Sequence, residues 1–164
     1  MGPRITVFGV GSRMMRDERA GVAVLEELAR RVLPRDVRLR ETGTDGYGLV
    51  NDFEDTDVAI IVDCAEMGRE PGTVLVFSPD EVASTVLDRR MSLHSLDLLG
   101  VIQLAQQLGY ETAIRVVGIQ PAVVDFGEEL SEAVAAAVPR AVALVERELA
   151  AAIQGAAPAA DRAE

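Results

Sequence analysis

Short apolar runs alternate with longer amphipathic segments along this chain, and this alternation restricts its possible folds more than any other feature. Each apolar run is long enough for one strand, and the segments between them carry apolar residues at helical spacing. Such a pattern is typical of βαβ units joined into a mostly parallel sheet. The sequence therefore predicts an α/β fold built on a mostly parallel, five-stranded sheet.

The expected elements follow from the positions of these runs. Strands are predicted at residues 4–9, 37–42, 58–65, 73–77 and 113–119. Helices are predicted at residues 19–33, within 44–54, at 94–108 and at 130–153. Helical spacing places these residues on the buried sides of the first and third helices: Val22, Leu25, Leu28, Ala29 and Val32, then Leu98, Leu99, Ile102 and Leu108.

The last predicted helix contains a proline. Pro139 removes one backbone hydrogen bond from this helix, so we expect a kink or break there. Residues 155–164 lack apolar periodicity and are expected to form a disordered tail. Residues 1–154 are expected to form a single domain, because the chain has the length of one ordinary α/β domain.

Composition excludes several functional classes. The 164 residues include one His (His94), one Cys (Cys64), 16 basic and 27 acidic residues, for a net charge of −11. One cysteine excludes a cysteine-rich zinc module, and one histidine excludes an HExxH metalloprotease. The acidic excess predicts no nucleic-acid partner. Without a signal peptide or an apolar run of roughly 20 residues, we expect a cytoplasmic protein with no membrane partner.

Three kinds of chemically useful side chains follow predicted strands at the edge where parallel sheets gather their ligands. Asp17 and Glu18 follow the first strand, Asp63 ends the central strand, and His94 lies at the start of a helix. Carboxylates with an imidazole suit a borderline divalent ion that keeps open positions. Ordinary structural roles also remain open, since acids favour helix starts and Asp caps turns.

Nucleophilic catalysis is a weaker alternative. Cys64 is expected to point away from Asp63 on its strand, and a buried, inert thiol is favoured over a reactive one. Ser12, Ser92 and Ser95 would need His94 as their base, and the chain lacks a G-x-S-x-G turn.

Dinucleotide binding is the other alternative. Gly9-Val10-Gly11 follows a strand, and Glu41 ends the next strand, as in a dinucleotide fingerprint. However, Met14 replaces the third glycine, and Asp17 and Glu18 would repel a pyrophosphate at the helix start.

Five motifs resemble, in the same order, those of the hydrogenase maturation endopeptidases, which process the large subunit of nickel–iron hydrogenases. GVGSRMMRDERAG resembles the family's opening G-x-G-N-x-x-x-x-D-[ED]-x-x-G, and ETGTDGYGLVNDF resembles its D-G-G-T stretch. IIVDCAEMGREPGTVLVF resembles its central strand and Pro-Gly hairpin. MSLHSLDLLG resembles its S-x-H-x-x-x-L helix start, and VVGIQPAVV its G-[IV]-[QE]-P turn. The resemblance implies three layers, with helices on both faces of a twisted sheet.

The resemblance also implies an activity: a metal-dependent endopeptidase that removes a C-terminal extension from the large-subunit precursor once nickel has been inserted. Glu18, Asp63 and His94 fall on the three positions that hold a metal in this family. The nickel would be supplied by the precursor, on its cysteine thiolates, and other divalent metals could occupy the same site. The precursor is thus the expected partner.

Further residues are assigned from the same resemblance. The loop expected to meet the substrate comprises Gly9, Gly11, Ser12, Asp17 and Gln120. Ser12 stands where the family usually has Asn. Glu41 stands where it usually has Asp, at a position linked to catalysis, and the extra methylene shifts the carboxylate. The nucleophile would be either a water activated by Glu41 as a base or a metal-bound water. If Glu41 disables the chemistry, the chain would be a non-proteolytic factor that binds the precursor.

Overall fold

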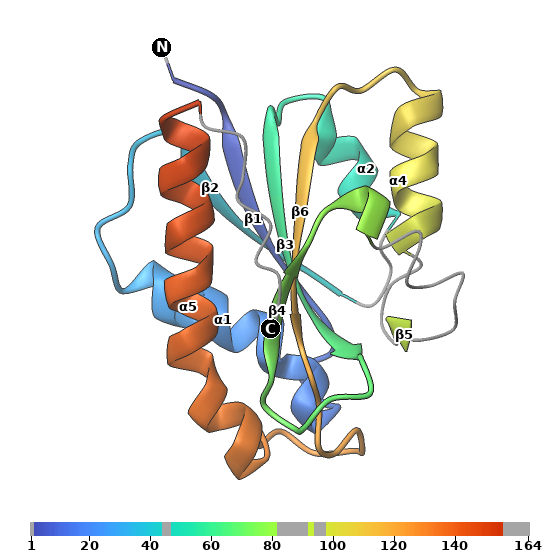
Figure 1. Cartoon of the computed structure of the whole chain (residues 1–164), viewed down its shortest axis with the longest axis vertical. Helices are drawn as coiled ribbons and strands as arrows, with labels where there is room; N and C mark the ends of the chain where they lie inside the picture. Colours follow the sequence, from blue (N-terminus) through green and yellow to red (C-terminus); the bar gives the residue numbers. More distant parts are fainter. Residues whose placement is uncertain (1, 44–46, 82–91, 94–97, 156–164) are drawn as a thin grey trace.

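The computed structural model describes residues 2–43, 47–81, 92–93 and 98–155, and its centre is a sheet between two helical layers (Figure 1). The main strands, in spatial order, are β2 (Val37–Thr42), β1 (Ile5–Val10), β3 (Val58–Glu66), β6 (Ala113–Ile119) and β4 (Val74–Phe77). All neighbours pair in parallel except β4, which is antiparallel to β6. A two-residue strand, β5 (Ser92–Leu93), pairs antiparallel with the end of β3. The predicted mostly parallel, five-stranded sheet is confirmed, with β5 as a short addition.

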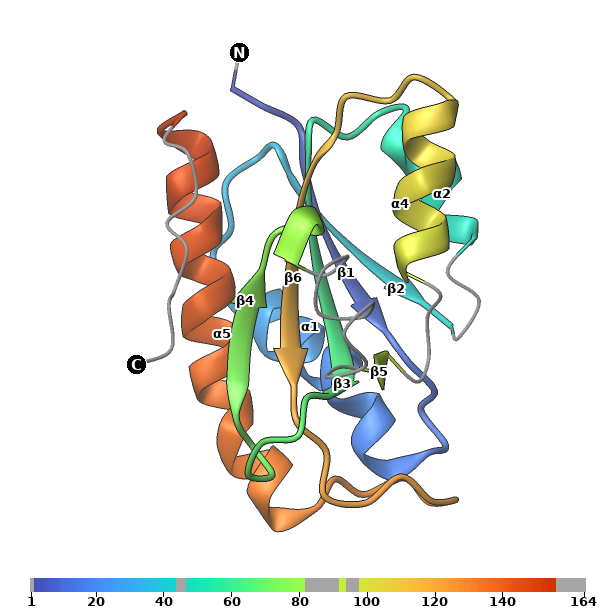
Figure 2. The ribbon, with the colours of Figure 1, turned by 45° about the vertical axis from the view of Figure 1, so that its right-hand side comes forward.

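Helices cover both faces of this sheet (Figures 1 and 2). One layer contains α1 (Ala20–Ala29) and α5 (Glu132–Ile153), and the other contains α2 (Gly48–Phe53) and α4 (Leu98–Gln107). A turn of 3-10 helix, η1 (Arg16–Arg19), leads into α1. Side chains alternate along β3, so that Ile60 packs in the α1/α5 core and Ile61 in the α2/α4 core. The predicted three layers are therefore confirmed.

Two helices end earlier than predicted. In α1 the last turn tightens, because Arg30 N donates to Glu27 O and Arg31 N to Leu28 O. Val32 is consequently fully exposed, at 102% of its reference area, and its predicted burial is wrong. After α4, Gly109 adopts a left-handed conformation (φ 79°) that ends the helix. Leu108 is therefore 55% exposed, and its predicted burial is wrong as well.

Of the kink or break predicted at Pro139, the break is absent, because α5 continues through this residue. Ser131 caps the helix by accepting a hydrogen bond from Val134 N. Val138 and Ala141, on either side of Pro139, are buried against the sheet. Packing on both sides of the proline thus sustains the helix despite the missing backbone bond.

Parts of three predictions lie outside the described residues. These are the tail at 156–164 and the starts of the helices predicted within 44–54 and at 94–108. Among the helices that are described, none has both the length and the apolar character needed to cross a bilayer.

Candidate functional site

The loop that follows β1 turns back tightly on its own backbone. Gly11 has a φ of 131°, and a Cβ added to it would lie 1.9 Å from Glu18 O. Only glycine permits this approach. Ser12 Oγ accepts a hydrogen bond from Met14 N at 3.2 Å, so the serine that replaces the family's Asn still stabilises the loop. On β1, a Cβ at Gly9 would lie 2.8 Å from Gly21 O. Both glycines of the predicted substrate loop therefore allow close packing.

Asp17 fastens this loop to the segment that follows β6. Its carboxylate is fully buried and accepts hydrogen bonds from Ala122 N (2.8 Å), Val123 N (2.7 Å), Ser131 N (2.7 Å) and Ser131 Oγ (2.9 Å). Burial alone would raise the pKa of Asp17, but the hydrogen bonds from Val123, Ser131 and Ala122 lower it below the ordinary value. Asp17 thus joins two loops that are more than 100 residues apart in sequence.

Glu18 and Asp63 lie at the same edge of the sheet. Glu18, in η1, is 8% exposed, and Asp63, in β3 beside Gly118 of β6, is fully buried. Burial raises the pKa of the Cys64 thiol, and the nearby carboxylates Asp63 and Glu18 raise it further. The turn η1, which carries Glu18, contacts β3, which carries Asp63 and Cys64. Contrary to the prediction, Asp63 does not end its strand, because β3 continues to Glu66.

His94, the third predicted metal ligand, lies outside the described residues, so its position stays a prediction. β5 pairs Leu93 with Ala65, which brings the chain to a point on β3 two residues beyond Asp63. Within the described ranges, no group of three or more His, Cys, Asp or Glu residues is arranged to hold a metal ion. The predicted set needs His94 as its third member.

Glu41 is bound by an arginine of the opening loop. Arg13 donates from Nε to Glu41 Oε1 and from Nη2 to Oε2, both at 2.6 Å. A third nitrogen of Arg13 donates to Glu26, which also accepts from Arg19. The pKa of Glu41 is lowered, chiefly by its hydrogen bond with Arg13. A carboxylate with both oxygens on a guanidinium is a weaker proton acceptor than a free one.

Replacing Arg13 with Met is expected to raise the pKa of Glu41 toward its ordinary value. With Arg13 present, Glu41 contributes stability above its unfolded pKa and loses it as the pH falls through the lowered folded pKa. The pair is half-exposed, so that contribution is about 1 kcal/mol or less. NMR titration of the Glu41 carboxyl carbon measures the shift. Arg30→Met, which removes only an exposed pair with Glu27, should leave the Glu41 midpoint unchanged.

Gln120, predicted to meet the substrate, is engaged inside the protein. Its side chain is buried, and Oε1 accepts hydrogen bonds from Met67 N (2.7 Å) and Arg69 N (3.2 Å). Its Nε2 donates to Glu66 Oε1 at 2.9 Å. Gln120 therefore holds the end of β6 against the turn that follows β3.

Cys64 is expected to be inert in the folded protein. Its side chain is fully buried, and burial raises the pKa of its thiol, so very little reactive thiolate is present. A disulfide reagent at mildly alkaline pH should leave the native protein unlabelled and label Cys64 once denaturant is added. Rapid labelling without denaturant would contradict this burial.

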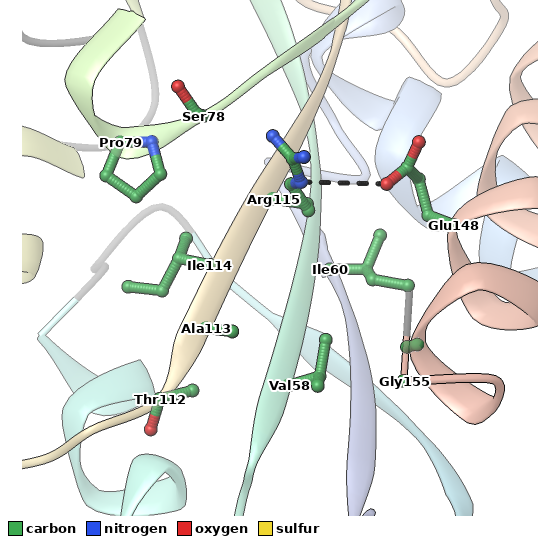
Figure 3. A pocket seen from close by; sticks show the side chains of 11 residues that line it. Val58, Ile60, Ser78, Pro79, Thr112, Ala113, Ile114, Arg115, Glu148 and Gly155 are labelled. Atoms are coloured by element: carbon green, nitrogen blue, oxygen red, sulfur yellow. Dashed lines mark ion pairs between the residues drawn. The ribbon is translucent and has the colours of Figure 1, made fainter. Parts of the chain in front are cut away.

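A separate cavity lies at the opposite end of the sheet (Figure 3). It measures about 620 Å³, and Val58 and Ala113, at the amino ends of β3 and β6, line it. Inside it, Arg115 Nε of β6 faces Glu148 Oε2 of α5 at 3.7 Å, and both side chains are at most 10% exposed. This ion pair links α5 to the sheet, and Arg115 lies three residues before Gly118, the register partner of Asp63.

Comparison with known proteins shows which family this chain belongs to. Residues 22–148 match the model of a family described as hydrogenase maturation protease. The chain belongs to this family. It is 35% identical to the hydrogenase expression/formation protein HupD of Rhodobacter capsulatus, over 89% of this chain and 71% of that protein. It is 32% identical to the hydrogenase 2 maturation protease of Escherichia coli, over 72% and 73% of the two chains.

Solved structures of maturation proteases share the fold. The hydrogenase maturating endopeptidase HybD from E. coli superposes with a TM-score of 0.80 at 30% identity, covering 90% of this chain and 92% of that one. HybD from Thermococcus kodakarensis gives 0.72 at 27% identity, covering 88% and 98%. The resemblance inferred from the five motifs is confirmed, and the family is one of hydrolases that act as endopeptidases in hydrogenase maturation.

Proposed function

We propose that this maturation protease removes the C-terminal extension of a nickel–iron hydrogenase large-subunit precursor after nickel insertion, and that it recognises the bound nickel. The observation that carries the proposal is the burial of two carboxylates, Glu18 on η1 and Asp63 on β3, on elements that contact each other at one edge of the sheet. Family membership supplies the reaction class.

The chemistry of these carboxylates supports nickel as the recognised group. A cation near buried carboxylates lowers the cost of keeping them ionised. Carboxylates and an imidazole, here Glu18, Asp63 and His94, are ligands that a borderline divalent ion accepts. With a single nitrogen, the set suits an ion already held by the precursor's thiolates. The nickel is then part of the substrate, and cleavage depends on its insertion.

The position of Glu41 supports a positioning role over proton acceptance. Both of its oxygens are bound by Arg13, so accepting a proton from water would require breaking a bidentate pair. We therefore assign Glu41 to ordering the loop that carries Ser12 and Met14. Nickel held by the precursor would supply the polarisation that activates a water as the nucleophile.

A cleavage assay with purified precursor tests this function. The protein should cut the nickel-loaded precursor and leave the nickel-free precursor intact. Glu18→Ala and His94→Ala should each lower the rate about 100-fold or more, as when a group that acts in the transition state is removed. Full cleavage by His94→Ala would contradict nickel recognition.

A non-proteolytic maturation factor is the second candidate, favoured by the same Arg13–Glu41 pair if Glu41 is needed as a base. Such a protein would bind the nickel-loaded precursor in a pull-down and leave its length unchanged. Mass spectrometry of the precursor after incubation therefore separates the two candidates.

A further inference from the structure

Two loops lie side by side next to the candidate site. The loop after β1 and the segment after β6 meet at the same end of the molecule (Figure 2). Gly127 N donates to Met14 O, and Arg16 N donates to Gly127 O, both at 2.8 Å. Asp17 N donates to Val123 O at 3.2 Å. Because Glu18 directly follows Asp17, this pair of loops borders the proposed nickel-recognition site.

Three large apolar side chains on these loops are exposed to solvent. Phe126 is 74% exposed, Met14 41% and Val124 40%. A single exposed apolar residue is ordinary, whereas several on two hydrogen-bonded loops are typical of an interaction surface. We call Met14, Val124 and Phe126 the apolar triplet.

The loops that carry the apolar triplet are held in place from within. The buried Asp17 carboxylate binds Ala122 N, Val123 N and Ser131 N of the second loop. Arg16 Nε adds a hydrogen bond to Glu129 O at 3.1 Å. A surface ordered before binding loses less conformational entropy when a partner arrives. The hydrogen bonds of Asp17 and Arg16 therefore hold the two loops in the arrangement that exposes the triplet.

The charges around the apolar triplet are mostly negative. Arg13 and Arg16 flank Met14, but Arg13 is paired with Glu41 and Glu26, and Arg16 Nε donates to Glu129 O. Residues 121–131 include Asp125, Glu128 and Glu129, all exposed, and contain no Arg or Lys. A partner with matching chemistry carries apolar side chains flanked by basic residues.

We propose that the apolar triplet is a docking surface for the precursor, and that it binds a segment in which apolar residues are flanked by Lys or Arg. This inference rests on the proposed function, because it takes the precursor as the partner. Docking at the triplet presents the nickel and the scissile bond to Glu18 on the adjoining turn. Loss of the apolar triplet should weaken precursor binding and leave the rate of the chemical step unchanged.

The test uses the full chain with Val124→Ser and Phe126→Ser combined. Calorimetry with nickel-loaded precursor should show Kd raised about 10- to 30-fold, as for the loss of a buried aromatic anchor. KM should rise by a similar factor, with kcat unchanged. Leu108→Ser, which removes a comparably exposed residue at the end of α4, is the matched control and should change neither. Glu128→Lys should also raise Kd and weaken its dependence on salt.

The outcomes separate this inference from the proposed function. If the wild-type protein cleaves the precursor and the double variant has unchanged Kd and KM, the docking surface is wrong and the function stands. If the wild-type protein binds without cleaving and the double variant binds more weakly, docking is supported and the endopeptidase proposal fails. If the wild-type protein does not bind the precursor, the docking inference is overturned.

Discussion

Asp17→Ala is expected to destabilise the protein by about 4 kcal/mol, whereas Glu18→Ala, one residue later, should cost about 1 kcal/mol or less. Removing the Asp17 carboxylate leaves the partly buried N–H groups of Ala122 and Val123 and the buried N–H of Ser131 without their acceptor. An orphaned buried group costs roughly 1–3 kcal/mol. The carboxylate of Glu18 accepts no hydrogen bond within the described part of the chain. Asp17 is therefore expected to stabilise the fold, whereas the neighbouring Glu18 should contribute little to stability.

Thermal and urea denaturation measure this difference. Asp17→Ala should melt roughly 10 °C below the wild-type protein, since 1 kcal/mol corresponds to about 2–4 °C for a chain of this size. Asp55→Ala is a suitable control, because that side chain is 74% exposed and, among the described residues, pairs only with Arg4. It should change stability by about 0.5 kcal/mol or less. Equal effects of Asp17→Ala and Glu18→Ala would contradict the assignment of Asp17 as the residue that joins the loops.

Gly21→Ala should cost about 2 kcal/mol or more, although alanine is the better helix former by about 1 kcal/mol. Gly21 lies in α1 at the point where this helix meets the sheet. An added Cβ would lie 2.5 Å from Val62 O of β3 and 2.8 Å from Val10 O of β1. Both contacts are with backbone atoms of paired strands, so relief requires α1 to move away from the sheet.

Gly48→Ala is the matched control for this prediction. Gly48 begins α2, and nothing lies within 4 Å of a Cβ added there. Alanine should therefore leave stability unchanged or raise it by up to about 1 kcal/mol. Chemical denaturation of both variants gives the comparison. A stabilised Gly21→Ala protein would show that the close approach of α1 to β1 and β3 is not required.

These predictions separate the parts of the opening motif. Gly11 and Gly21 permit backbone contacts, and Asp17 joins the loop to residues 122–131. Glu18 is the member for which we propose a role in recognising nickel. The contacts of Gly11, Gly21 and Asp17 in this motif are therefore structural.

Local patterns in the sequence were enough to predict the order of the elements. Strand periodicity and the Gly/Pro boundaries depend on neighbouring residues, which is why the strand at 113–119 is correct to the residue. The motifs likewise identified the family. Helix ends were less predictable: α1 stops at Ala29 through a tightened last turn, and Val32 keeps helical spacing without being helical.

The sequence by itself thus determined the α/β class, the order of strands and helices, and membership of the maturation protease family. Only the tertiary structure decided that Asp17 binds the backbone of a distant loop and that Arg13 occupies both oxygens of Glu41. It also decided that Glu18 and Asp63 are buried on elements that contact each other. The Asp17 and Glu41 contacts join residues that lie 28 to 114 positions apart. Which residues meet across such separations depends on the path of the folded chain. A local sequence pattern does not contain that information.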